Sequence, residues 1–115
     1  MTLEINTRQE QDVTVLEMKG RILVGESGRL FHETVREHMD KGAKKILLNF
    51  RGVTYIDSVG VGELVGALVA IRKISGELKL AGLTPRVRDL LDITGVHKLV
   101  EITGDEAAGL QAFHK

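Results

Sequence analysis

A serine that could carry a phosphate stands near the middle of the chain, in the run Asp57-Ser58-Val59-Gly60. An apolar segment ends shortly before this run, and a helical pattern begins with it. A serine at such a junction can cap the helix, because its hydroxyl accepts a hydrogen bond from a free backbone N–H of the first turn. The same position places a phosphorylatable hydroxyl at the positive end of the helix dipole. Capping and phosphorylation are therefore both open for Ser58.

The neighbours of Ser58 bear on this choice. Serine caps are common, so capping is the simpler interpretation. Asp57 can supply a cap as well, and the loop follows an apolar strand, at the edge where α/β sheets usually carry their functional groups. A phosphate on Ser58 would gain from the helix amides but be repelled by Asp57 and Glu63, so its main effect would be to repel a docked partner.

Three glycines, Gly60, Gly62 and Gly66, follow the serine and suggest a nucleotide-binding motif. The third glycine comes one residue late for a dinucleotide fingerprint, and no Gly-Lys-Ser/Thr follows that would make a phosphate-binding P-loop. Each glycine in a helix interior costs roughly 1 kcal/mol relative to alanine. We therefore expect tight packing here, or a partner that approaches the start of the helix. The glycines also leave open that a small ligand binds at the start of the helix, which would be a separate function.

No other group of side chains has the spacing of a catalytic or metal site. The histidines, at positions 32, 38, 97 and 114, show no ligand spacing, and the absence of cysteine excludes thiolate metal sites and disulfides. No histidine is placed by a motif to activate Ser58 as a nucleophile. The basic cluster at Lys41, Lys44 and Lys45 is explained by solvation beside a helix end. We expect no enzyme activity, cofactor or metal.

The composition narrows the remaining classes. A chain of 115 residues is long enough for one domain with one core. A formal net charge of +0 and an aromatic content of 3% argue against direct nucleic-acid binding. No apolar run approaches the roughly 20 residues of a membrane span, and residues 1–4 have no signal-peptide character. We expect a cytoplasmic protein that does not insert into membranes.

Hydrophobic periodicity predicts the elements that position Ser58. The expected strands cover residues 3–7, 13–18, 44–50, 77–81 and 97–102, and the expected helices cover residues 26–41, 58–74, 84–95 and 105–113. Gly20 is expected to break the second strand before a short apolar segment, 22–24. Helices that alternate with strands after an opening hairpin indicate an α/β fold, with a mixed sheet of four to five strands covered by about four helices. The prediction is a single domain over residues 1–115.

The chain resembles the STAS-domain anti-sigma factor antagonists over nearly its whole length. The matching stretches are Val13-Thr14-Val15-Leu16, Gly20-Arg21-Ile22, Ile46-Leu47-Leu48-Asn49-Phe50, Tyr55-Ile56-Asp57-Ser58-Val59-Gly60-Val61-Gly62 and Pro85-Arg86-Val87-Arg88-Asp89-Leu90-Leu91-Asp92-Ile93-Thr94-Gly95. The last two stretches, at this separation, are more specific than an isolated Asp-Ser pair.

The resemblance implies a partner switch controlled by phosphorylation. In this family the unphosphorylated antagonist binds an anti-sigma factor, which is a serine kinase and which then releases its sigma factor. The kinase phosphorylates the serine that corresponds to Ser58, the phosphoprotein no longer binds, and a separate phosphatase restores it. The resemblance thus implies a phosphorylation site at Ser58 and a partner surface that includes Asp57, Ser58, Val59, Gly60 and Gly62.

Two positions depart from the family pattern. The family usually has Ser or Thr where this chain has Val59, and it often has Asp where this chain has Leu23. The loss of a hydroxyl beside the phosphate and the gain of an apolar side chain at Leu23 indicate an altered partner surface. A constitutive adaptor of the same fold, in a lipid-transport or signalling complex, is the alternative function.

Overall fold

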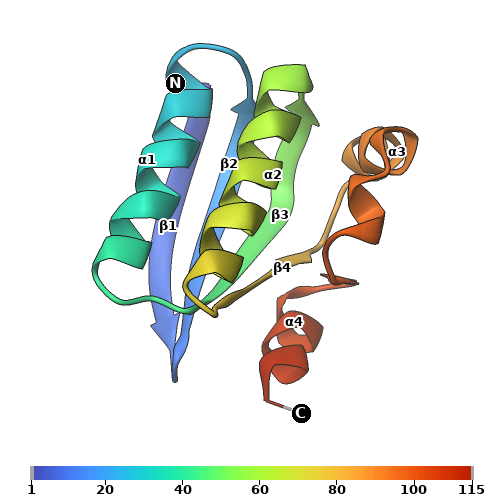
Figure 1. Cartoon of the computed structure of the whole chain (residues 1–115). Coiled ribbons are helices and arrows are strands. Elements are labelled where there is room, and N and C mark those ends of the chain that lie inside the picture. The colour runs from blue at the N-terminus through green and yellow to red at the C-terminus, as the bar shows by residue number, and fades with distance from the viewer. Residues whose placement is uncertain (1, 115) are drawn as a thin grey trace.

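A five-stranded mixed sheet with the strand order β1-β2-β3-β4-β5 forms the centre of the computed structural model, which describes residues 2–114 (Figure 1). β1 pairs antiparallel with β2, and the other neighbouring strands are parallel. The strands are β1 (Leu3–Glu10), β2 (Val13–Ile22), β3 (Lys45–Ile56), β4 (Glu77–Ala81) and β5 (Ile102–Thr103), and the helices are α1 (Glu26–Asp40), α2 (Ser58–Lys73), α3 (Pro85–Thr94), the short 3₁₀ helix η1 (Val96–Lys98) and α4 (Glu106–Phe113). The expected α/β class is confirmed.

Helices cover both faces of the sheet because its central strands are apolar on both sides. Leu16 and Leu48 point into the main core, which α1 and α2 enclose together with residues of α3. Their sequence neighbours Val15 and Leu47 belong to a second, smaller cluster, which Phe113 of α4 completes. Since successive strand residues face opposite sides, these two clusters lie on opposite faces of the sheet.

Local signals set the ends of the predicted helices. Thr84 caps α3 through a hydrogen bond from the Val87 N–H, Pro85 occupies the first turn, and Gly95 ends the helix in a left-handed conformation with φ 80°. Asp105 caps α4 by accepting from the Ala108 N–H. The expected boundaries of these two helices are confirmed to within about a residue.

Gly20 does not break β2, contrary to the expectation. The strand continues to Ile22, with a register shift between Gly20 and Arg21 against β3. Gly20 has φ 118°, and a Cβ atom there would lie 2.1 Å from the carbonyl oxygen of Thr2. The glycine therefore marks an irregularity where the chain passes close to β1, and the strand carries on beyond it. β3 likewise extends past Phe50 to Ile56.

The strand expected over residues 97–102 is wrong. The chain turns at Gly95 and forms η1, in which the N–H of Lys98 donates to the carbonyl of Gly95 and the N–H of Leu99 to that of Val96. Val96 is buried whereas Leu99 is 45% exposed, so the apolar residues of this segment follow a turn instead of alternating along a strand. Only Ile102–Thr103 joins the sheet.

Candidate functional site

Asp57, and not Ser58, caps α2. The Asp57 backbone is extended, and its Oδ1 accepts a hydrogen bond of 2.8 Å from the Gly60 N–H. Ser58 is the first residue of the helix, its side chain is exposed, and its hydroxyl has no hydrogen-bonding partner among residues 2–114. The interpretation of Ser58 as the cap is therefore wrong, and its hydroxyl is left free in the first helical turn.

The second carboxylate oxygen of Asp57 ties the β2–α1 loop to the start of α2. Asp57 Oδ2 accepts from the Val24 N–H at 2.9 Å, and the Asp57 N–H donates to the Ile22 carbonyl at 3.2 Å. The hydrogen bonds from Val24 and Gly60 lower the pKa of Asp57, because they stabilise its charged form. One carboxylate thus fixes the relative position of two segments that are 33 residues apart in the sequence.

The β2–α1 loop is held from its other side by α1. The Leu23 N–H donates to Ser27 Oγ at 2.8 Å, and the Gly28 N–H donates to the Leu23 carbonyl at 2.8 Å. Leu23 is consequently half-buried, whereas the next residue, Val24, is 67% exposed. Val24 was expected only as part of the apolar segment 22–24 and not as a site residue, although Gly25 directly after it signals that the apolar run ends in a turn.

Gly60 and Gly62 have different environments. A Cβ atom on Gly60 would lie 2.4 Å from the Ile22 carbonyl oxygen and 2.6 Å from Ile56 Cγ1, so this buried glycine allows α2 to pack closely against the ends of β2 and β3. Gly62 is exposed, and a Cβ atom there would meet nothing within 4 Å. The close approach expected at both glycines is internal at Gly60, and only Gly62 stays available to a partner.

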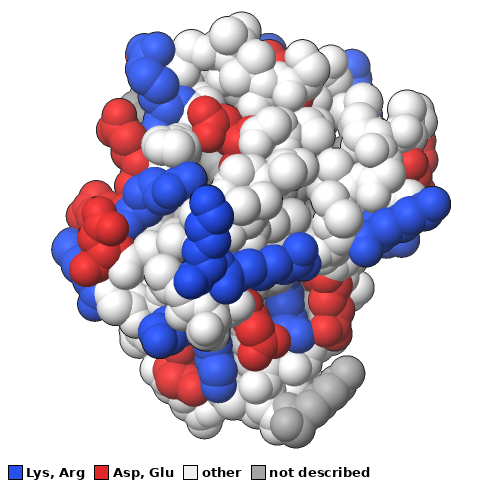
Figure 2. Space-filling view, in the orientation of Figure 1, with Lys and Arg blue, Asp and Glu red and all other residues white. Residues whose placement is uncertain are grey.

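Ser58 lies in a mainly apolar surface. Val59 is 42% exposed next to it, and Val24 projects from the loop that Asp57 tethers. Figure 2 shows that the surface around the start of α2 carries few charged side chains. An exposed hydroxyl among apolar side chains is suited to contact with another protein, in which a phosphate would be buried without a counter-charge.

Glu63 has a partner on the neighbouring helix. Its Oε1 lies 2.8 Å from Nδ1 of His32 in α1, so this pair links the two helices one turn below Val59. The Glu63 carboxylate thus has a hydrogen-bonding partner within the fold, whereas the sequence pattern places it only as a charge near Ser58. The spacing of the histidines in the sequence does not predict this contact.

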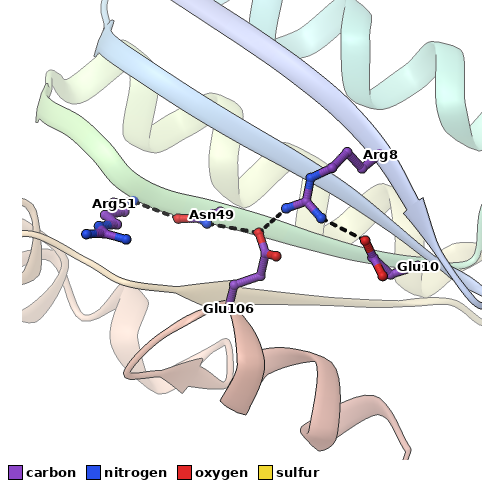
Figure 3. Close-up of polar contacts among 5 residues, drawn as sticks. All are labelled: Arg8, Glu10, Asn49, Arg51 and Glu106. Atoms are coloured by element: carbon purple, nitrogen blue, oxygen red, sulfur yellow. Dashed lines mark hydrogen bonds and ion pairs between the residues drawn. The ribbon is translucent and has the colours of Figure 1, made fainter.

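A second polar cluster lies on the opposite face of the sheet (Figure 3). The carboxylate of Glu106 in α4 accepts from the Arg8 guanidinium and, at 3.1 Å, from Asn49 Nδ2. Asn49 Oδ1 accepts from the Arg51 N–H, and Arg8 also pairs with Glu10 at 2.9 Å. Burial acts to raise the pKa of Glu106, but the hydrogen bonds from Arg8 and Asn49 outweigh it and lower the pKa. The cluster satisfies its own polar groups and fastens α4 to the sheet.

Neither a metal site nor a membrane-spanning helix is found among the described residues. Residues 2–114 contain no group of three or more metal-ligating side chains placed to share an ion. Within the same range, every helix is too short or too polar to cross a bilayer.

Comparison with known proteins points in one direction. A family model described as "STAS domain" matches residues 4–108. The anti-sigma-B factor antagonist of Bacillus subtilis (strain 168) is 29% identical over 111 residues, which cover 96% of this chain and 100% of that protein. The anti-sigma F factor antagonist of Paenibacillus polymyxa is 31% identical over 100 residues, which cover 80% of this chain and 86% of that protein.

Solved structures share the fold. A Thermotoga maritima protein proposed to be an anti-sigma factor antagonist superposes with a TM-score of 0.91 at 24% identity, covering 96% of this chain and 95% of its own. The anti-sigma factor antagonist SpoIIAA gives a TM-score of 0.73 in its unphosphorylated form, at 16% identity and with 96% and 98% of the two chains covered. Its phosphorylated form, from Bacillus, gives 0.72, at 18% identity and with 95% and 99% covered. The fold is thus similar to both forms of SpoIIAA.

Proposed function

We propose that this chain, which belongs to the STAS domain family, is an anti-sigma factor antagonist whose binding to an anti-sigma factor is switched by phosphorylation of Ser58. The observation that carries the proposal is the state of Ser58. Its hydroxyl is exposed in the first turn of α2 and is not needed as a cap, because Asp57 has that role. A modification there can change the surface without removing a contact that holds the fold.

The physical effect of the phosphate follows from its surroundings. A phosphoserine carries about −1.5 to −2 charges at neutral pH. At Ser58 this charge would lie beside Asp57, whose pKa is lowered, and next to the exposed Val59, on the same surface as the exposed Val24. A partner that covers these apolar side chains would have to desolvate the dianion without a matching cation, and it would therefore bind much more weakly.

The proposed partners follow from the same scheme. The unphosphorylated chain binds an anti-sigma factor that is a serine kinase, the kinase modifies Ser58, and a phosphatase acting on phospho-Ser58 restores the binding form. The chain is a substrate and a ligand and is not itself an enzyme. We expect it to act in the cytoplasm, without direct contact to nucleic acid and without insertion into a membrane. Leu23 and Val59 belong to the proposed partner surface together with Asp57, Ser58 and Gly62, and Gly60 supports that surface from below.

Phosphosite mapping and binding measurements test the proposal together. Wild type and Ser58→Ala are incubated with ATP and each purified anti-sigma factor kinase of the source organism, and the products are mapped by mass spectrometry. Phosphate is expected on Ser58 of the wild type and nowhere on the variant.

Calorimetry then measures binding of Ser58→Asp, which is expected to lose at least about tenfold in affinity, equivalent to about 1.4 kcal/mol. Gln111→Glu adds one negative charge at an exposed position of α4 and serves as the matched control. Retained binding by Ser58→Asp, together with an unmodified Ser58 in the presence of a kinase active on another antagonist, would refute the switch.

A constitutive adaptor is the second candidate, and the exposed Val59 favours it. A valine beside Ser58 can take part in a permanent apolar interface, where a hydroxyl would not. The adaptor predicts a stable complex whose affinity is the same for wild type, Ser58→Ala and Ser58→Asp. A small ligand at the helix start predicts instead that a nucleotide at millimolar concentration raises the melting temperature.

A further inference from the structure

A groove lies between the C-terminal halves of α1 and α2, away from Ser58. It has a volume of about 530 Å³, and the residues that define it are Arg36, Met39, Gly66, Val69, Lys73 and Ile74. Val69 is 47% and Ile74 is 37% exposed, although both belong to the apolar residues of α2 and its end. The groove therefore offers apolar walls to solvent.

The floor of the groove is a glycine that the fold itself does not require. A Cβ atom on Gly66 would meet nothing within 4 Å, and its φ is not positive. Glycine destabilises a helix interior relative to alanine, so an alanine would fit this position and favour the helix. Gly60 in the same helix differs, because a Cβ atom there would collide with the Ile22 carbonyl. No contact among the described residues requires the small size of Gly66.

The rim of the groove carries two cations and one acidic residue. Arg36 and Lys73 have no ion-pair partner among the described residues, and Asp40 is the one acidic residue that lines the groove. Figure 2 shows several Lys and Arg side chains across the C-terminal half of α2, in contrast to the mainly uncharged surface near its start. An apolar floor between unpaired cations is complementary to an amphipathic segment with acidic side chains.

The groove is continuous with the surface around Ser58. Gly28 faces Val59 across the same two helices, and the His32–Glu63 pair follows one turn further down. Position 66 is eight residues from position 58, which corresponds to about 12 Å along a helix. A protein interface of ordinary size, about 800 Å² per partner, would be large enough to cover both places.

We propose that this groove is a second docking surface for the anti-sigma factor, in which an apolar side chain of an acidic amphipathic helix packs on Gly66 while acidic side chains reach Arg36 and Lys73. This inference rests on the proposed function. It adds that the partner is recognised along the whole α1–α2 face, by a part of the surface that phosphorylation of Ser58 does not touch.

The test fills the groove without disturbing the fold. Gly66→Leu places a side chain over the open floor, and the variant is expected to melt no lower than wild type and to bind each cognate anti-sigma factor kinase about tenfold more weakly by calorimetry. Gly104→Leu adds the same side chain at an exposed glycine that also has nothing within 4 Å of its Cβ direction, and it should bind as wild type does.

A charge series provides the second measurement. The double variant Arg36→Glu/Lys73→Glu is expected to weaken binding and to flatten its dependence on salt concentration, whereas Lys98→Glu on η1 should change neither. Wild-type affinity for Gly66→Leu and for the double variant, alongside lost affinity for Ser58→Asp, would overturn the groove and leave the switch intact. A wild-type chain that binds no anti-sigma factor would overturn both.

Discussion

Asp57 and Glu106 both join a helix to another part of the molecule, but their oxygens accept from different donors. Asp57 accepts from two backbone N–H groups, those of Val24 and Gly60. Glu106 accepts from the side chains of Arg8 and Asn49. Backbone donors leave the side chains of the loop free to face outward, which is how Val24 stays exposed. Near α4, the side chains of Arg8 and Asn49 are instead engaged with Glu106.

The two regions differ in how far their exposed side chains can be altered without loss of the fold. Near Ser58, the side chains of Asp57 and Ser27 bind main-chain groups, whereas the Ser58 hydroxyl makes no hydrogen bond within residues 2–114. At the α4 end, the polar side chains are themselves the contacts. We therefore expect the fold to tolerate a covalent modification of Ser58 better than a modification of the Arg8–Glu106 cluster.

Alanine substitutions at two buried glycines should show the largest difference in stability between the region near Ser58 and the region near α4. Gly60→Ala is expected to destabilise the fold by about 3 kcal/mol, because its Cβ would collide with the rigid backbone carbonyl of Ile22. Gly109→Ala in α4 should cost less than half as much, since its Cβ meets mainly the end of the Leu47 side chain, at 2.8 Å, which can move. Chemical denaturation measures both. Equal losses would mean that the two helices are packed with the same rigidity.

Removal of each carboxylate should have a smaller effect. Asp57→Ala loses the cap of α2 and the tether to Val24, and we expect about 2 kcal/mol lower stability. Glu106→Ala breaks a partly exposed ion pair and one hydrogen bond, with an expected loss of about 1 kcal/mol. Amide hydrogen exchange should show faster exchange at Val24 in the first variant and at α4 in the second. Faster exchange at α4 in Asp57→Ala would contradict the separation of the two ends.

The smallest expected effect is on the pH dependence of stability, to which both carboxylates contribute. Asp57 and Glu106 both have lowered pKa values in the folded chain. A carboxyl with a lowered folded pKa contributes stability that is complete above its unfolded pKa and is lost as the pH falls through the folded value. Melting temperatures should therefore fall below about pH 4, and Asp57→Asn should reduce this slope. An unchanged slope in that variant would show that Asp57 is not stabilised in its charged form.

Asp12 also contributes to the loss of stability at low pH. Hydrogen bonds from Lys45 and His114 lower its pKa to about 2, so Asp12→Asn supplies a matched control for charge removal far from Ser58. Its effect should add to that of Asp57→Asn, because the two carboxyls share no partner.

Much of the fold was predictable because the segments have strong periodicity and clear end signals. The apolar spacing of residues 58–74 and the Thr84-Pro85 pair with Gly95 each specify a helix locally, and the structure confirms them. Residues 97–102 could not be assigned in this way. A short run that mixes three polar with three apolar residues is compatible with a strand or a turn, and the choice depends on how Val96 packs in the core.

The position of the site was predictable from the sequence, but the hydrogen bonds that hold it were not. The sequence marks Asp57 and Ser58 as the junction, yet either residue can cap a helix, and only the backbone geometry assigns that role to Asp57. The bond from Val24 to Asp57 spans 33 residues and that from Arg8 to Glu106 spans 98. Such contacts are made by tertiary folding and have no local pattern. The roles assigned to Leu23, Val59 and Gly62 in partner binding stay predictions.

The position of Ser58 in the first turn of a capped helix has a consequence for how it can be recognised. Its backbone is held by the fold, so an enzyme that modifies it in place cannot take it up as an extended strand. Recognition must then read a folded surface assembled from distant segments of the chain. A short peptide copied from residues 52–65 would lack that surface and should be a poor substrate. Such a requirement would insulate one signalling circuit from another, even between antagonists that share the Asp-Ser pair.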